Sequence, residues 1–94
     1  MILPFEIADK STEKRLTWYD AQDYVKTLGN GWRLPFLNEL DLMYQNENNL
    51  NSQGYWSSTE FDIDHAWIQY FATGNHSNLN KNGYYYIRAI RDLK

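Results

Sequence analysis

A short connector, Trp32-Arg33-Leu34-Pro35, lies between two segments that have helical periodicity. A proline disfavours helical geometry in the residue before it, so we expect an extended Leu34 and a sharp turn of the chain. The guanidinium of Arg33 can lie across an aromatic ring or bind a carboxylate, and Glu39 is a nearby candidate. Trp32 is expected to fill the core beneath the helix pair. The sequence therefore predicts a rigid, packed corner.

The segment before this corner predicts a helix that begins after Thr17. Thr17 can cap the helix while Asp20, three residues later, reaches back as in a capping box. The apolar residues that recur at helical spacing and form one face are Trp18, Ala21, Val25 and Leu28.

The remaining chain predicts one more helix and several strands. The second helix is expected from about residue 38 to 45, capped by Asn38, with Leu37, Leu40 and either Met43 or Tyr44 facing inward. Strands are predicted at residues 2–8, 55–59, 65–72 and 84–91, with polar turns or loops at 9–15, 46–54 and 73–83. This order predicts a single domain over residues 1–94, of the α+β class with two helices on a twisted antiparallel sheet.

Composition excludes several kinds of site. The chain has no cysteine, which excludes disulfides, zinc–thiolate sites and cysteine nucleophiles. Its formal net charge is −3, from 9 basic and 12 acidic residues, which disfavours a nucleic-acid partner. The apolar start lacks a basic leader and is too short for a signal peptide or a membrane span. A cytoplasmic or virion-associated protein is therefore expected rather than a secreted one.

An acidic segment raises the question of a cation site. Glu60, Asp62 and Asp64 alternate beside His65, so an extended backbone would place the three carboxylates on one face. A divalent cation could bind there, but the spacing is not that of an EF-hand. A solvated acidic loop is the simpler interpretation, and we expect no cofactor.

Serine and histidine residues raise the question of hydrolysis. Ser57 and Ser58, with His65 or His76 and an aspartate, could supply the residue types of a triad. However, nothing resembles a nucleophile elbow, and the two serines fall in a predicted strand. We therefore expect no enzymatic activity.

Four motifs follow one another in the order of a known family. They are Trp32-Arg33-Leu34-Pro35 with Glu39-Leu40, Tyr55-Trp56-Ser57-Ser58-Thr59, Ala66-Trp67 with Phe71 and Gly74, and Tyr86-Ile87-Arg88-Ala89-Ile90-Arg91. This succession, over residues 17–91, resembles the bacterial and phage domain found at the C-terminus of a Legionella collagen-like adhesin. That domain is similar in fold to C-type-lectin-like domains, including the variable proteins of diversity-generating retroelements and the formylglycine-generating enzymes.

The resemblance implies a C-type-lectin-like fold with its first and last strands paired. Ser57 and Ser58 would satisfy backbone groups, and Arg88 and Arg91 would pair with acidic residues. The motif residues expected to have structural roles are Trp32, Arg33, Pro35, Trp56, Trp67, Phe71 and Arg88. Of these, the resemblance implies that Trp56, Trp67 and Phe71 lie in the core.

The chain also departs from the family pattern. Phe36 stands where the family usually has a threonine that caps the second helix. The triplets of calcium-dependent sugar-binding lectins are missing, as are the paired cysteines of formylglycine-generating enzymes. The resemblance therefore argues against both of these activities.

A surface rich in Tyr and Asn is predicted in the C-terminal half. If Trp67 and Phe71 face the helices, then Ile68 and Tyr70 face loops or solvent. In the variable-protein relatives the ligand-facing residues come from this region, and Tyr and Asn are typical of binding surfaces. The candidate ligand-binding residues are Tyr70, Asn75, His76, Asn78, Asn80 and Tyr84.

These observations favour a non-catalytic module that binds a protein or glycan in adhesion, phage or host recognition. The alternative is an intracellular protein-binding regulator or inhibitor, encoded by a phage. A homo-oligomer also fits, because exposed aromatic residues near a sheet edge promote pairing.

Overall fold

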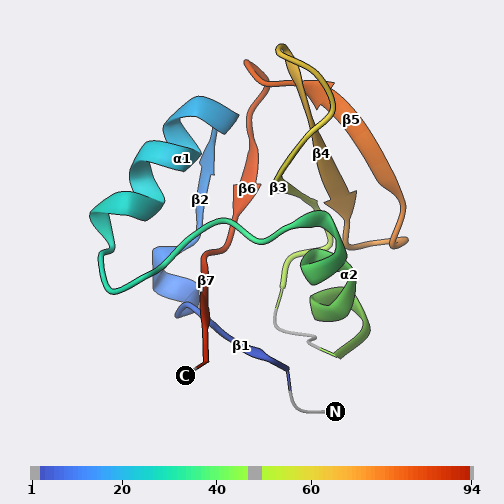
Figure 1. Ribbon diagram of the computed structural model, residues 1–94. Coiled ribbons are helices and arrows are strands. Elements are labelled where there is room, and N and C mark those ends of the chain that lie inside the picture. The colour runs from blue at the N-terminus through green and yellow to red at the C-terminus, as the bar shows by residue number, and fades with distance from the viewer. Residues whose placement is uncertain (1–2, 47–49, 94) are drawn as a thin grey trace.

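Residues 3–46 and 50–93 are described by the computed structural model, in which two α-helices accompany two β-sheets (Figure 1). The α+β class predicted from the sequence is confirmed. The elements in chain order are β1 (Phe5–Ile7), a 3₁₀ helix (Lys10–Thr12), β2 (Lys14–Leu16), α1 (Trp18–Thr27), α2 (Leu37–Asn46), β3 (Gly54–Glu60), β4 (His65–Tyr70), β5 (His76–Asn80), β6 (Tyr85–Ile87) and β7 (Ile90–Asp92).

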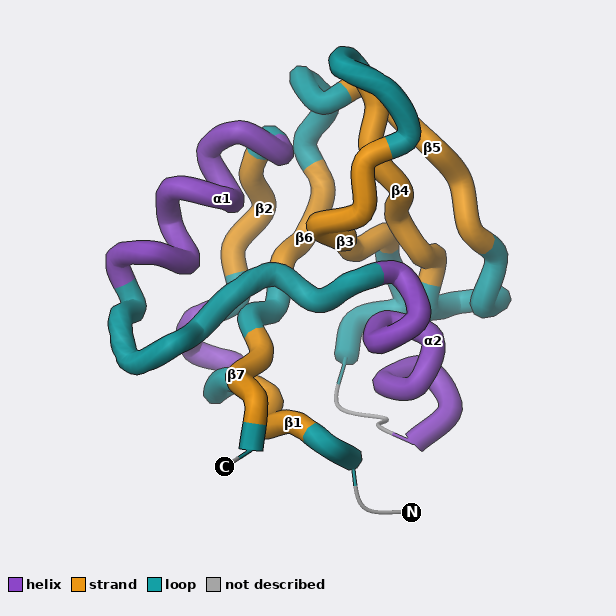
Figure 2. The backbone as a smooth tube through the Cα atoms, viewed as in Figure 1, coloured by secondary structure: helices purple, strands orange, loops and turns teal. Residues whose placement is uncertain are grey.

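The larger sheet has five strands in the order β2-β6-β3-β4-β5 (Figure 2). Most neighbours are antiparallel, but β3 and β6 run parallel, with Tyr55 beside Tyr86. The predicted antiparallel sheet is thus a mixed sheet with one parallel pair. After β5, the chain returns to lie between β2 and β3, and its antiparallel pairing with β2 sets β6 parallel to β3.

The two ends of the chain lie together in the smaller sheet. β1 pairs antiparallel with β7, so that Phe5 lies opposite Asp92 and Ile7 opposite Ile90. The predicted pairing of the first and last strands is confirmed (Figure 1).

Two strands occur where the sequence predicted turns or loops. β2 lies at the end of the segment 9–15, and β5 lies within the segment 73–83. Both are edge strands, and both are mostly polar, so they lack the apolar alternation by which a half-buried strand is predicted. In β5, only Leu79 packs against a hydrophobic cluster. The strand predicted at 84–91 is divided at Arg88 and Ala89, where the chain passes from one sheet to the other.

Both helices begin with side-chain caps, one of them unexpected. The Thr17 hydroxyl accepts the Asp20 N–H at 3.2 Å, which confirms the predicted cap of α1. The prediction that Asn38 caps a later α2 was wrong, because α2 begins at Leu37. The Thr59 hydroxyl, from β3, accepts the Leu37 N–H at 3.0 Å, and the Glu39 carboxylate accepts the Phe36 N–H at 2.8 Å. Thr59, which is distant in sequence, thus provides a hydrogen-bond acceptor for one of the free backbone N–H groups at the start of α2.

The helices pack on opposite faces of the large sheet. Trp56 belongs to a hydrophobic cluster with Ala21 and Val25 of α1, whereas Tyr55, its neighbour in β3, belongs to a second cluster with residues of α2. Successive side chains of a strand point to opposite faces. Our expectation that one face packs against both helices and the other faces loops or solvent was therefore wrong.

The motif aromatic residues differ in burial. Trp56 is fully buried, and its indole N–H donates to the Leu16 carbonyl at 3.0 Å. Trp32 and Phe71 are half-buried, one against each cluster. Trp67 is also half-buried but lies outside both clusters, contrary to its expected core position, because Ala66 and Ile68 take the side of β4 that faces the cluster of α1.

The Trp-Arg-Leu-Pro connector forms the predicted corner, with Pro35 fully buried. Arg33 donates to both oxygens of Glu39 at 2.8 Å each, and its Nη2 also donates to Asp92 at 2.7 Å. The Glu39 hydrogen bonds raise the pKa of Arg33, and the Arg33 hydrogen bond lowers the pKa of Asp92. The corner therefore ties α2 to the last strand through a paired guanidinium.

A buried polar cluster joins the residue before β2 to β3 and to the link between β6 and β7. Arg88 Nη2 donates to Glu13 at 2.9 Å, and the Tyr55 hydroxyl donates to the same carboxylate at 2.6 Å. Asn51 also donates to Glu13 through its side-chain amide. Burial, followed by the hydrogen bond to Glu13, raises the pKa of Tyr55.

This cluster predicts a specific alkaline destabilisation. Because the folded pKa of Tyr55 lies above its ordinary value of 10.0, the stability it provides is fully present below about pH 10 and is lost as the pH rises toward the folded pKa. Urea unfolding from about pH 8 to about pH 11 should show a steeper stability loss in the native chain than in Tyr55→Phe. Equal slopes would mean that Tyr55 ionises as freely in the folded chain as in the unfolded chain.

Candidate functional site

Three of the predicted ligand-binding residues lie on one face of the β4–β5 pair. The antiparallel register places His76 opposite Gln69, Asn78 opposite Trp67, and Asn80 opposite His65. Paired side chains of an antiparallel ladder share a face. The intervening pair, Ala66 and Leu79, faces the cluster of α1. The residues with even numbers in β5 and odd numbers in β4 therefore face the side on which α2 lies.

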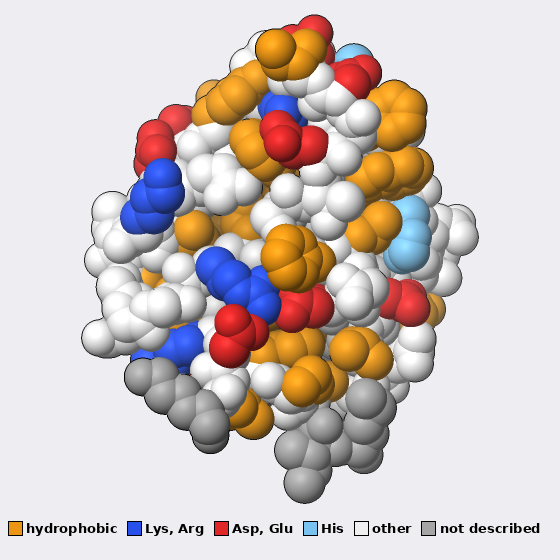
Figure 3. Space-filling view, in the orientation of Figure 1, with side chains coloured by type: hydrophobic (Ala, Val, Ile, Leu, Met, Phe, Trp, Pro, Cys, Tyr) orange, Lys and Arg blue, Asp and Glu red, His pale blue; other side chains and the backbone are white. Residues whose placement is uncertain are grey.

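On this side of the sheet, residues of β4, of β5 and of the turn between β3 and β4 form a surface that we call the aromatic–amide face. It consists of Phe61, His65, Trp67, His76, Asn78 and Asn80. The Phe61 side chain is 55% exposed and meets the half-buried Trp67 edge-on, with ring centroids 5.6 Å apart. Hydrophobic side chains and a histidine gather over β4 and β5 on the right of the molecule (Figure 3). This combination can stack on a planar group and hydrogen-bond beside it.

A polar network connects the aromatic–amide face to α2. Gln69 is fully buried, and its amide donates to Asp41 of α2 at 3.1 Å and to the Gly74 carbonyl at 3.2 Å. His76 Nε2 lies 3.9 Å from the same Asp41 carboxylate. Position 74 has to be glycine, because its φ is +83° and a Cβ would lie 2.7 Å from the Tyr44 ring. The network therefore holds in place the part of the aromatic–amide face that lies next to α2.

The other three predicted residues lie elsewhere. Tyr70 packs against the cluster of α1, on the opposite side of the sheet. Asn75 lies in the turn before β5, where its carbonyl accepts the Tyr70 N–H at 2.8 Å. Tyr84 is 55% exposed and follows the turn after β5. The face thus brings together His76, Asn78 and Asn80 but not these three residues.

The acidic segment between β3 and β4 is held by Lys81. This lysine is buried, and its ammonium donates to Glu60 at 2.6 Å and to the Ile63 carbonyl at 2.9 Å. The same ammonium lies 4.4 Å from the centroid of the Trp18 ring, which adds a cation–π contact. Lys81 therefore ties the β3–β4 turn to the start of α1.

The same segment does not assemble a cation site. Asp62 accepts hydrogen bonds from the His65 ring and from the Asp64 N–H, and the His65 bond lowers the pKa of Asp62. Glu60 is paired with Lys81. Among residues 3–46 and 50–93, no three acidic or histidine side chains are grouped to hold a metal ion.

The two serines of β3 bind the backbone. Ser57 is buried, and its hydroxyl donates to the Trp67 carbonyl at 2.7 Å. The Ser58 hydroxyl donates to the Pro35 carbonyl at 3.4 Å. The expectation that both satisfy backbone groups is confirmed.

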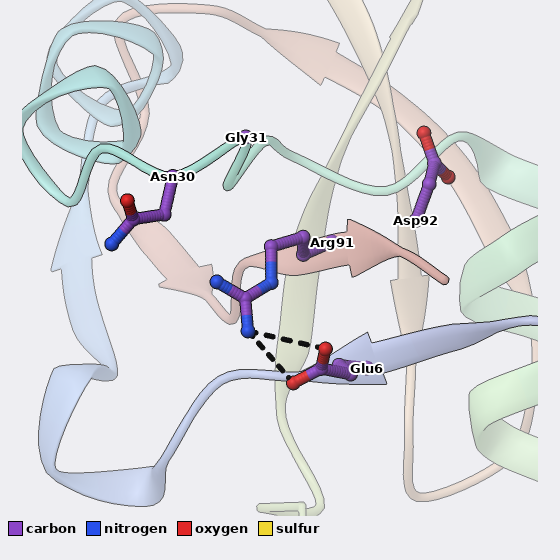
Figure 4. A pocket seen from close by; sticks show the side chains of 5 residues that line it. All are labelled: Glu6, Asn30, Gly31, Arg91 and Asp92. Carbon is purple, nitrogen blue, oxygen red and sulfur yellow. Dashed lines mark hydrogen bonds and ion pairs between the residues drawn. The ribbon is translucent and has the colours of Figure 1, made fainter. Parts of the chain in front are cut away.

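An open depression of about 650 Å³ lies beside the small sheet, lined by Glu6, Asn30, Gly31, Arg91 and Asp92 (Figure 4). Arg91 Nη2 donates to both Glu6 oxygens, at 3.0 and 3.1 Å, while its guanidinium lies 4.4 Å from the centroid of the Trp32 ring. The predicted ion pair of Arg91 is confirmed. The charged side chains that line this depression are engaged in ion pairs, Arg91 with Glu6 and Asp92 with Arg33.

The family model described as the Lcl C-terminal domain matches residues 6–91. The chain belongs to the Lcl C-terminal domain family. The match runs from β1 to β7 and includes the whole aromatic–amide face. A search of curated proteins finds no match to this chain.

In the part of this Lcl C-terminal domain that the structure describes, neither helix is long and apolar enough to cross a bilayer.

The roles of Gln69, Asp41 and Lys81 in this Lcl C-terminal domain were not predicted. Gln69 and Asp41 come from different elements and meet only through packing of α2 on β4. Lys81 stands in a polar stretch that resembles an ordinary loop. For Gln69, one sequence signal was available. It is a polar residue within the mostly apolar strand β4, and it lies on the same side of that strand as Trp67, which suggests a polar partner for it on that side.

Proposed function

We propose that this chain is a non-catalytic binding module that recognises a protein or glycan partner through the aromatic–amide face. The observation that carries the proposal is the position of Trp67, which is half-buried outside both hydrophobic clusters and directly opposite Asn78. A large ring in this position contributes little to the core and remains accessible to a ligand.

The chemistry of the face favours recognition. Trp67 and Phe61 offer rings for stacking, and Asn78 offers an amide that both donates and accepts hydrogen bonds. The Asn80 amide oxygen accepts the Asn82 N–H at 2.8 Å, so Asn80 offers mainly its NH₂ group as a donor. Side chains of this kind bind protein surfaces and sugar rings without changing them chemically. The polar network of Gln69 and Asp41 holds the neighbouring backbone in place, which lowers the ordering cost of binding.

The family and fold are consistent with this role. The resemblance to the domain of a collagen-like adhesin suggests a module used in attachment to a phage or bacterial host. The paired termini and the two helices on a twisted sheet also fit a C-type-lectin-like relationship. We propose that the chain is related to C-type-lectin-like domains and that its binding face derives from that fold, because C-type-lectin-like folds carry binding surfaces.

The test is a paired screen with tagged native chain, Trp67→Ala, Asn78→Ala and, as a control, Tyr19→Ala on α1. Each is applied to a glycan array and to a lysate of the host. Binding that survives in Tyr19→Ala and falls at least about tenfold in Trp67→Ala and Asn78→Ala supports the proposal.

Two other results of this screen would distinguish between the alternatives. A single protein captured at stoichiometry, with no glycan bound, favours a protein-binding regulator over an adhesin module. Binding that is unchanged in Trp67→Ala and Asn78→Ala, with all variants folded by circular dichroism, rejects the face as the site.

A further inference from the structure

β5 leaves one row of backbone groups without a neighbouring strand. The Tyr70 N–H donates to the Asn75 carbonyl, and the Lys81 N–H donates to the Asp64 carbonyl, both at 2.8 Å. Hydrogen bonding alternates along an antiparallel strand, so residues 75, 77, 79 and 81 direct their amides toward β4. The amides and carbonyls of His76, Asn78 and Asn80 therefore point outward, where the described chain provides no further strand.

The opposite edge of the same sheet is protected. β2 has only three residues, and two of them, Lys14 and Arg15, are charged and exposed. Short length and charge are the usual means of preventing edge-to-edge pairing. β5 has five residues without charge or proline, and it pairs with β4 over all five without a bulge. The sheet therefore has one protected edge and one edge suited to pairing.

The outward groups are spaced for another strand. Residues two apart in a strand repeat at about 6.8 Å, and their amides and carbonyls alternate as donors and acceptors along the edge. An extended polypeptide matches this pattern, whereas sugar hydroxyls do not repeat it.

The pattern is also symmetric about Asn78. Antiparallel pairing of two β5 strands across a two-fold axis would place Asn78 opposite its copy and His76 opposite Asn80, with no like charges opposed. The Asn80 carbonyl accepts the Gly83 N–H at 3.0 Å and keeps a second lone pair for the partner. We propose that this chain forms a symmetric dimer in which two β5 strands join the sheets of both copies.

Dimerisation would enlarge the aromatic–amide face, and this consequence rests on the proposed function of that face. Paired residues of an antiparallel ladder share a side, so both faces would point the same way. Trp67 lies opposite Asn78, and the axis would pass between Asn78 and its copy, so one row would contain Trp67, Asn78 and their two copies. The two Trp67 backbones would be three strand spacings apart, roughly 14 Å. A single extended partner could contact both indole rings.

The test is sedimentation equilibrium of the native chain and four variants without any ligand. Asn78→Pro removes the outward N–H together with the side-chain amide, and proline is tolerated at such edge positions. Asn78→Lys places two ammonium groups together at the axis. The controls are Asn78→Ala, which keeps the backbone groups, and Thr27→Lys, which adds the same charge at the exposed end of α1.

We expect the native chain to associate with rising concentration, Asn78→Ala and Thr27→Lys to behave alike, and Asn78→Pro and Asn78→Lys to associate at least about tenfold more weakly. A native chain that stays monomeric up to about 1 mM, or variants at Asn78 that all dimerise equally, would overturn the dimer. If Asn78→Pro fails to fold, Asn78→Lys decides the question.

The dimer and the proposed function fail separately. Trp67→Ala should keep the dimer while losing the partner in the screen. A monomeric native chain that still binds a partner through Trp67 would retain the proposed function, and the edge of β5 would then be open to a strand of a different protein.

Discussion

Replacing Trp56 with alanine is expected to lower the free energy of unfolding by about 3–5 kcal/mol, enough to unfold most of a domain of this size. The indole is fully buried, meets the Tyr85 ring edge-on at 5.2 Å, and satisfies the Leu16 carbonyl. Its removal would leave a cavity in the cluster that joins α1 to the large sheet. Urea unfolding followed by far-UV circular dichroism measures the loss.

Trp67→Ala is the matched control, because it removes the same side chain from β4. We expect it to cost roughly 1 kcal/mol, since the indole is half-buried, lies outside both hydrophobic clusters and meets the exposed Phe61 ring edge-on. Equal losses for the two variants would mean that Trp67 is a core residue after all, as the sequence resemblance implied.

Replacing Glu13 with alanine is expected to lower the free energy of unfolding by about 3–5 kcal/mol. The variant leaves the Arg88 guanidinium, whose side chain is only 4% exposed, without a carboxylate. It also removes the acceptor of the Tyr55 hydroxyl. Most of the cost is the burial of an uncompensated charge.

Glu6→Ala is the control for this variant. It breaks the ion pair with Arg91, which is partly exposed, and such pairs contribute about 0–1 kcal/mol. The double variant Glu13→Leu with Arg88→Met should recover much of the stability, because neither charge remains buried. A small effect of Glu13→Ala would show that water reaches Arg88 readily.

Local sequence signals were sufficient for part of the fold. The cap and apolar face of α1 lie within one helix, and the bond from Arg33 to Glu39 spans six residues. Contacts that depend on tertiary packing were not predictable. The cap of α2 by Thr59 spans 22 residues, and the bond from Lys81 to Glu60 spans 21. No pattern in the sequence brings such pairs together.

The candidate site was predictable in composition but not in geometry. Asn78, Asn80 and His76 were chosen for their residue types in a segment that looked like a loop. Their common direction comes from the register of β5 on β4, which the sequence of an edge strand does not reveal. Trp67 was assigned to the wrong environment because alternation within a strand does not say which side α1 covers.

The most direct measurement is a map of backbone amide chemical shifts in the ¹⁵N-labelled chain, titrated with the partner that the screen identifies. The proposed binding surface predicts that the largest changes fall on Phe61, His65, Trp67 and the β5 residues Asn78 and Asn80. Changes centred on Asn30, Gly31 and Arg91 would contradict it, because they would place the partner in the depression beside the small sheet.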